Sequence, residues 1–353
     1  MTRFLDRAET FEPRGTLLSA SRSLLAFAEL TVLLFTPDRL LFGSTPYASP
    51  RQLCSGVSGL SLWCVSGGGP RAEQAGTVVA VAVLVAVTAG FRPRWLCIPH
   101  WYIAFSLAGR MSALNGGEEI AQIFTLLLIP QCLGDTRTWH WRRPDQPMAP
   151  AWRGSAYAAH LLLRLQIVVV YLDAALSKLA YPAWQHGTAV RTLLNDPQNG
   201  LPLALRPLAD HLLGPIWISA AVTWSVIAME LGIATSMLFR ARVRRRALAL
   251  AVCLHTAIIL AMGLFSFGLV MIALLMATPG GALRQRPRLR PRAAVAPGAE
   301  PEPEPEAEPE PAVPVTAPAG AGAATAAATA ATDPAGPEPG PRCSGNSTSR
   351  KQP

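Results

Sequence analysis

Long apolar blocks constrain the fold of this chain more than any other feature of its sequence. Several come close to the length of a helix that crosses the hydrocarbon core of a bilayer, about 17–25 residues. Half of the 353 residues are hydrophobic and 15% are charged, with a mean hydropathy of +0.29. A soluble domain of this size normally carries more charge. The sequence therefore predicts an all-α polytopic integral membrane helical bundle.

Eight apolar segments can be distinguished along the chain, which predicts about eight transmembrane helices. They are Thr16–Thr36, Gly76–Phe91, Trp95–Gly109, Glu119–Leu133, Ala156–Ala180, Leu212–Phe239, Ala247–Gly263 and Ser266–Ala277. The last two could form one helix, but that helix would be too long for a single crossing without strong tilt. Gly263 marks the expected break. We expect a cytoplasmic N-terminus over 1–15, a transmembrane domain over 16–278, and a tail over 279–353.

Arginine clusters follow every second apolar segment. Their members are Arg92 and Arg94; Arg137, Arg142, Arg143 and Arg153; Arg240, Arg242, Arg244, Arg245 and Arg246; and Arg284, Arg286, Arg288, Arg290 and Arg292. The positive-inside rule then predicts a multi-pass protein of the cell membrane with both termini cytoplasmic. The net charge of +9 is explained by topology and does not indicate a nucleic-acid partner. The tail is rich in Pro, Ala and Glu, so we expect it to be disordered.

Two of the six cysteines, Cys54 and Cys64, lie in the first extracytoplasmic loop, 37–75. In an oxidising compartment this pair predicts a disulfide, and the alternative is two free thiols. Cys97, Cys132 and Cys253 lie in or beside apolar segments, where cysteine usually behaves as a small hydrophobic residue. No cysteine spacing resembles a zinc or iron–sulfur site, so no metal site is predicted.

Lys178 is the candidate catalytic residue. The chain has two lysines, and the other, Lys351, lies in the tail. All other cations are arginine, which stays protonated under nearly all conditions, whereas a desolvated lysine can lose its proton. An ionisable residue within a membrane segment is a functional candidate by default. The alternative is a lysine that extends its ammonium to the lipid–water boundary.

Further polar side chains accompany Lys178 at helical spacing. Arg164, Tyr171 and Lys178 are seven residues apart and share one face, while Gln166 and Asp173 share another. Two polar stripes predict a helix that is buried among others or lines a wet cavity.

Other ionisable residues also lie at membrane depth: Arg22, Glu29, Glu119, Glu230 and His255. Together with Arg164, Tyr171 and Asp173, Glu230 and His255 form the predicted polar network. Each residue taken singly is explained by a structural hydrogen bond or ion pair. A proton relay and a substrate site are the alternatives for the group.

A short motif, YPAWQHGTAV, follows the Lys178 segment. Trp184 suits the membrane interface, and Gly187 indicates a tight turn. In the predicted topology this motif is extracytoplasmic and places Lys178 at the mouth of a cavity that opens outward.

The run QIVVVYLDAALSKLAYPAWQHGTAVRTLLNDPQNG, over Gln166–Gly200, resembles the SdpB-like branch of the HTTM (horizontally transferred transmembrane) family. The shared pattern is a helix ending in Ala-Ala-x-x-Lys-Leu, then Trp, then Gly-Thr-Ala. Glu230 and His255 fall on recurrent family positions, and the Cys54–Cys64 loop is similar to the SdpB type. The resemblance covers roughly Arg14–Ala277.

The resemblance implies an integral membrane protein that assists maturation or export of a secreted antimicrobial peptide toxin. Expected partners are membrane lipid, the secreted peptide and other maturation proteins. The family also includes the vitamin K-dependent gamma-carboxylases, in which the lysine matching Lys178 is the catalytic base. A quinone- or lipid-dependent enzyme is therefore the alternative, and a transporter is a third class. The residues do not decide whether the chain is an enzyme, and they identify no cofactor.

Overall fold

The computed structural model describes residues 2–37, 41, 54–65, 70–109, 116–197 and 199–279. Within these ranges the chain is helical, and its one extended pairing is an isolated bridge between Phe91 and Trp139. The described residues all belong to one unit. The predicted disordered tail after its first residue and the last arginine cluster lie outside the described residues. Residues 38–40, 42–53 and 66–69 of the first long loop also lie outside them.

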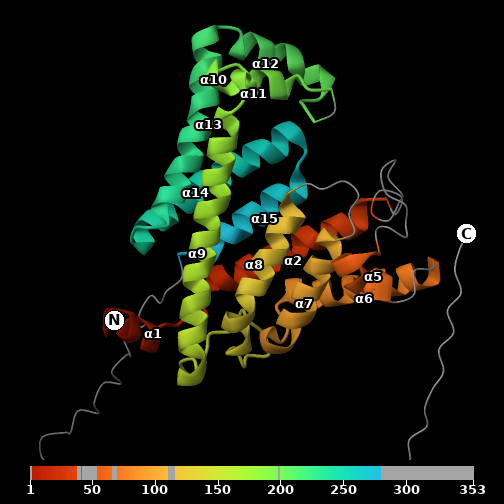
Figure 1. Cartoon of the computed structure of the whole chain (residues 1–353), viewed down its shortest axis with the longest axis vertical. Helices are drawn as coiled ribbons and strands as arrows, with labels where there is room; N and C mark the ends of the chain where they lie inside the picture. Colours follow the sequence, from red (N-terminus) through yellow and green to blue (C-terminus); the bar gives the residue numbers. More distant parts are fainter. Residues whose placement is uncertain are drawn as a thin grey trace, which may run out of the picture. The chain divides into compact units, whose positions relative to one another are not determined.

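Each of the eight apolar segments contains one helix (Figure 1). These are α2 (Thr16–Phe35), α6 (Pro70–Ala89), α7 (Pro93–Ala108), α8 (Gly117–Leu133), α9 (Pro150–Leu179), α13 (Ile216–Ser236), α14 (Ala241–Met262) and α15 (Phe265–Met276). The shorter helices are α1 (Thr2–Glu9), η1 (Gly56–Leu60), α5 (Leu62–Val65), α10 (Pro182–Gln185), α11 (Ala189–Leu194), η2 (Leu203–Leu205) and α12 (Arg206–Leu213).

Prolines account for two of the differences from the predicted boundaries. Helix α9 starts at Pro150 rather than Ala156, because proline at the first helical position already has the required φ and needs no hydrogen-bond acceptor. Helix α13 starts at Ile216 rather than Leu212, because Pro215 is in an extended conformation and separates it from α12.

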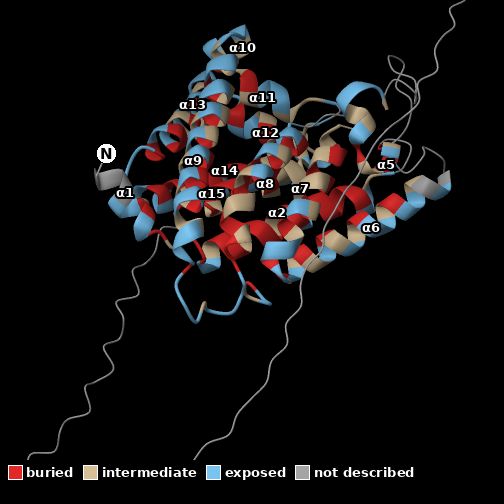
Figure 2. Ribbon diagram, turned by 60° about the horizontal axis from the view of Figure 1, so that its bottom comes forward, coloured by how far each residue is buried: buried red, intermediate tan, exposed pale blue. Residues whose placement is uncertain are grey.

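Four helices in the described ranges are long and apolar enough to cross a membrane, namely α2, α9, α13 and α14. Of their apolar windows, 72% is buried in α2 but only 33%, 28% and 22% in α9, α13 and α14. Helix α2 is therefore the central helix, while the other three leave much of their surface on the outside of the bundle (Figure 2).

Helix α2 joins two hydrophobic clusters. Leu25 belongs to the larger cluster, which contains side chains of α8, α9, α13, α14 and α15. Ala26, on the adjacent face, belongs to a second cluster with α6, α7 and the buried Trp63. An apolar face on each side of one helix explains why α2 lies at the centre.

The break predicted at Gly263 is confirmed. Gly263 has φ +68° and ends α14, with its N–H donating to the carbonyl oxygen of Ile259 at 2.9 Å. Glycine adopts this left-handed conformation without the strain that a side chain would add. Helix α15 then packs against α2, where the Ser21 hydroxyl donates to the Ala273 carbonyl oxygen at 2.6 Å.

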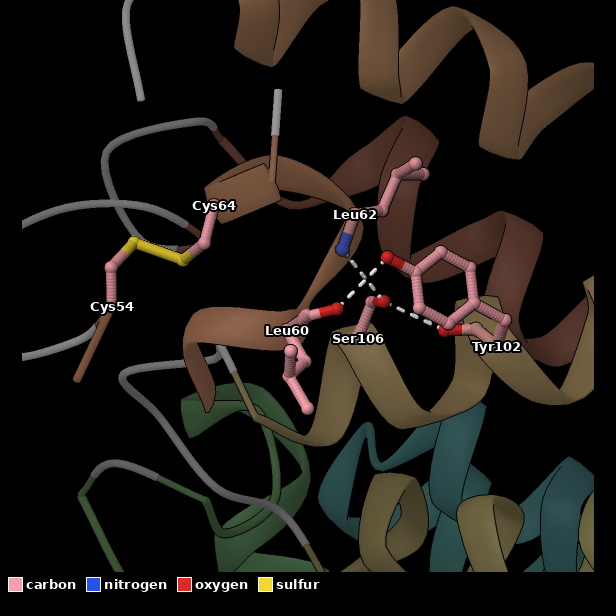
Figure 3. The surroundings of a disulfide bond; sticks show 6 residues. All are labelled: Cys54, Leu60, Leu62, Cys64, Tyr102 and Ser106. Carbon is pink, nitrogen blue, oxygen red and sulfur yellow. Dashed lines mark hydrogen bonds between the residues drawn. A yellow bond between two sulfur atoms is a disulfide. The ribbon is translucent and has the colours of Figure 1, made fainter. Parts of the chain in front are cut away.

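Cys54 and Cys64 are joined by a disulfide, with Cα atoms 5.6 Å apart. The segment between them is attached to α7, as Figure 3 shows. The Tyr102 hydroxyl donates to the Leu60 carbonyl oxygen at 2.8 Å, and the Leu62 N–H donates to the Ser106 hydroxyl at 2.9 Å. The disulfide therefore closes a loop that α7 already holds.

We expect Cys54→Ser to lower the free energy of unfolding by about 2–4 kcal/mol, because the bond limits the freedom of the unfolded chain. Thermal unfolding of the purified protein in detergent measures this loss. A membrane-permeant thiol reagent applied without reductant should label Cys253, which is free and lies on the outer surface of α14, and should leave Cys54 and Cys64 unmodified. Labelling of both cysteines in the unreduced wild type would contradict the disulfide.

Candidate functional site

Lys178 lies in the last turn of α9 and makes an ion pair with α13. Its Nζ donates to Glu230 Oε1 at 2.8 Å and to the Ala174 carbonyl oxygen at 3.1 Å. The ammonium also lies 5.4 Å from the centre of the Trp184 ring. The side chain of Lys178 is 24% exposed and that of Glu230 is 9% exposed. The pair is therefore buried on the α13 side and accessible on the Lys178 side.

Tyr171 lies two helical turns before Lys178 on the same face of α9, and its side chain reaches α14. Its hydroxyl lies 2.8 Å from Nε2 of His255, and both residues are buried. The His255 ring meets Phe267 of α15 edge to face, with the ring centres 5.7 Å apart. This hydrogen bond joins α9 to α14, just as the ion pair joins α9 to α13.

Arg164 completes this face of α9. Its guanidinium donates through Nε at 2.8 Å and through Nη2 to the Met237 carbonyl oxygen, directly after α13 ends. Met237 is the C-cap residue of α13, and the carbonyl groups at the end of a helix have no partner within that helix. The arginine therefore caps α13 from a neighbouring helix.

Asp173 lies apart from the network in which the sequence placed it. It is exposed on α9, and it makes no side-chain hydrogen bond or ion pair within the described ranges. Gln166, on the same stripe, is half-buried. The structure does not bring Asp173 into the predicted polar network, because the buried residues of α9 lie on its other face.

Two atoms of the site have unused hydrogen-bonding capacity. Glu230 Oε2 and His255 Nδ1 are buried and have no hydrogen-bond partner among the described residues. A buried polar atom without a partner costs free energy. These two atoms are therefore positions of the site that no described residue satisfies. No group of three His, Cys, Asp or Glu suited to a metal ion occurs in the part of the chain that the structure describes.

Gly187 fixes the motif that follows Lys178. It has φ +73°, and its carbonyl oxygen accepts bonds from Ser219 at 2.9 Å and Thr223 at 3.0 Å, both on α13. A Cβ atom at this position would lie 2.6 Å from the Cα of Ala220. The turn therefore lies directly against the first half of α13 and holds α10, which carries Trp184, beside the site.

Sequence reasoning found Arg22 and Glu29 but not their partners. Arg22 donates to Nδ1 of His140 at 3.1 Å, and His140 Nε2 lies 3.2 Å from the Ser23 hydroxyl. Burial, together with the charge of Arg22, lowers the pKa of His140 to about 3, so His140 is neutral. Nothing local in the sequence connects these residues, which are 118 positions apart.

The second acid of α2 has a partner on α7. Glu29 Oε2 lies 3.2 Å from His100 Nε2, close enough for an ion pair but not aligned as a hydrogen bond. On α8 the buried acid is Glu118, whereas Glu119, which the sequence favoured, is exposed. Helical spacing in the sequence could have identified Glu118 as the buried acid, because it shares a face with Ala121, Thr125 and Leu128, which are buried.

Comparisons with known proteins place most of the chain in one family. The HTTM domain family matches residues 76–279. The chain is similar to the sporulation-delaying protein SdpB of Bacillus subtilis (strain 168), with 31% identity over 269 residues, which is 76% of this chain and 82% of SdpB. It is also similar to YitO of the same strain, described as an uncharacterized protein, with 27% identity over 273 residues, 77% of this chain and 87% of YitO. No solved structure matches significantly.

We expect Gly187→Ala to be destabilising by at least about 2 kcal/mol, because it adds a clash with α13 to an unfavourable φ. Gly232→Ala on α13 is the matched control, since a Cβ there meets nothing within 4 Å. Thermal unfolding in detergent compares the two variants. Equal stability of both would show that the Gly187 turn does not depend on its contact with α13.

Proposed function

The chain belongs to the HTTM domain family, and we propose that it is an SdpB-type membrane protein that assists the maturation or export of a secreted antimicrobial peptide toxin. The similarity to SdpB over most of both chains supports an SdpB-type membrane protein. The observation that carries the role of the site is the ion pair between Lys178 and Glu230, which joins two apolar helices within the matched region. Ion pairs between such helices are expensive to bury and usually have a function.

The geometry supports binding of a polar group of the client peptide. Lys178 is the more accessible partner of the pair, and Trp184 lies beside it. A peptide carboxylate could share the ammonium with Glu230, and a peptide N–H could bind Glu230 Oε2, which is otherwise without a partner in the described ranges. Lys178 is held by two oxygens, the Ala174 carbonyl and Glu230 Oε1, which suits a side chain that orients a bound group. Binding is therefore favoured over general-base catalysis.

Eight membrane crossings with both termini in the cytoplasm form part of this proposal. Contacts between the ends of helices support these crossings. The Arg14 guanidinium donates to the Gln146 carbonyl oxygen at 2.7 Å, which brings the start of α2 to the loop between α8 and α9. The Arg92 N–H donates to the Thr138 carbonyl oxygen at 2.7 Å, which adds the start of α7 to the same end of the bundle.

The third arginine cluster also supports an even number of crossings. Arg244, near the start of α14, donates through Nε to the Thr278 carbonyl oxygen at 2.9 Å. The turn before α14 and the end of α15 therefore lie together, as a pair of antiparallel helices requires. In this topology the Lys178 end of α9 is extracytoplasmic, which is the side from which a secreted peptide leaves.

A reporter that is active only in the cytoplasm should be active when fused after Thr278 and inactive when fused after Leu201, because the proposed topology puts these positions on opposite sides. A second reporter, active only outside the cytoplasm, should give the reverse pattern. Extracytoplasmic activity at Thr278 would mean an odd number of crossings and would contradict the topology.

Lys178→Ala should reduce secreted toxin activity roughly ten- to a hundredfold, since a hydrogen bond to a charged group contributes about 1.5–3 kcal/mol. Lys178→Arg should lose function in the same way, because a planar guanidinium does not reproduce an ammonium that bonds both Ala174 and Glu230. The host strain lacking this chain is complemented with each variant, and antimicrobial activity and secreted peptide mass are measured in the medium.

Asp173→Asn is the matched control, because Asp173 is charged, lies on the same helix and is exposed away from the site. It should secrete toxin at the wild-type level. Membrane fractions must contain equal amounts of every variant. Near-normal activity of Lys178→Arg would show that position 178 needs only a positive charge. Glu230 and His255 would then be better candidates than Lys178 for the residues that carry the function. Unchanged activity in the deletion strain itself would refute the proposed function.

A further inference from the structure

A large basic cleft lies at the end of the bundle opposite the Lys178 end of α9. Its volume is about 1020 Å³, and it lies between the start of α7, the end of α8 and the segment that leads into α9. A smaller hollow of about 210 Å³ adjoins it. Arg94 and Arg137 line both. The larger cleft is also lined by Arg14, Arg142, Arg143 and Arg153.

The arginines of the cleft fall into two groups. Three of them are used by the fold: Arg14 pairs with Glu12, Arg137 pairs with Asp135, and Arg153 donates to backbone carbonyl oxygens. Burial raises the pKa of Glu12, but the hydrogen bonds from Arg14 and Met148 and the charge of Arg14 together lower it by more, so the net pKa is lowered. These pairs make the wall of the cleft rigid.

The remaining arginines have no acidic partner. Arg94, Arg142 and Arg143 are exposed and form no ion pair within the described ranges. Asp145 also lines the cleft but pairs with none of them in those ranges. Three cations around one concave surface, opposed by one carboxylate, produce a positive potential that favours an anion.

Tryptophan places the cleft at the level of the membrane surface. Trp95 lines the smaller hollow, is 70% exposed and lies next to Arg94, whose guanidinium carbon is 6.0 Å from the ring centre. Tryptophan is enriched at the boundary between lipid and water. One turn further along α7, Ile98 is 51% exposed and continues the apolar surface away from the arginines. An anion bound here would therefore have an apolar surface beside it.

We propose that this cleft binds the phosphate of an anionic membrane lipid, with Arg94, Arg142 and Arg143 around the headgroup and an acyl chain along the exposed face of α7. Guanidinium groups bind phosphate oxygens in pairs, which suits a phosphodiester. The apolar face next to the cations selects a lipid over a soluble anion. The site is separate from Lys178 and does not depend on the proposed role in peptide maturation.

The test measures binding of phosphatidylglycerol to the full-length protein in detergent, by native mass spectrometry and by the lipid-dependent shift in melting temperature. Each arginine near a lipid surface contributes roughly fivefold in affinity. The triple variant Arg94→Gln, Arg142→Gln, Arg143→Gln should therefore bind at least about tenfold more weakly than the wild type. The corresponding triple lysine variant keeps the charges but loses the paired guanidinium bonds, so it should bind with an affinity between those of the wild type and the glutamine variant.

The control variant Arg240→Gln, Arg242→Gln, Arg246→Gln removes the same charge from exposed positions outside the cleft, and it should bind as the wild type does. Equal weakening of the two glutamine variants would show a general attraction to basic surface and would overturn the proposal. Equal binding of phosphatidylcholine would overturn it as well. Inorganic phosphate that competes as well as the lipid would mean a site for soluble anions and would also overturn it.

Discussion

Polar side chains between apolar helices must find partners on other helices, and this constraint determines how α9 packs. No water is available in hydrocarbon to satisfy them. On one face of α9, Arg164, Tyr171 and Lys178 each reach a different partner, on or just after α13 and on α14. Apolar contacts allow helices to slide or rotate with little cost, but three polar contacts spaced seven residues apart do not. They set both the rotation of α9 and its position along the two partner helices.

The same constraint acts on α2, with a different outcome. Arg22 and Glu29 are buried in the middle of the bundle, and both have histidine partners, one in the loop before α9 and one on α7. Both ring nitrogens of His140 have partners, because Ser23 bonds the second one, whereas Arg22 Nη2 has no hydrogen-bond partner among the described residues. The contact of Glu29 is only a close approach. Helix α2 is therefore held firmly at the His140 end and less completely at the His100 end.

Much of this architecture could be predicted from the sequence, because the signals concerned are local. Apolar runs gave the eight helices, Gly263 gave the break before α15, and seven-residue spacing placed Lys178 with Tyr171. Contacts between distant segments could not be predicted. No local pattern pairs Arg22 with His140, and none showed that Asp173 lies on the outer side of α9. The choice of Glu119 over Glu118 was wrong by one residue, since a shift of one position turns a side chain by about 100° around a helix.

The packing of α15 against α2 has a consequence for biosynthesis. The hydroxyl of Ser21 bonds a carbonyl oxygen 252 residues later in the chain. At a translation rate of about 5–20 residues per second, the central helix waits roughly 10–50 s for this neighbour. In the first half of that interval Arg22 is in the nascent chain before its partner His140, 118 residues later, has been synthesised. The insertion machinery must therefore shelter the first long helix, and the bundle closes only when its last helix leaves the ribosome.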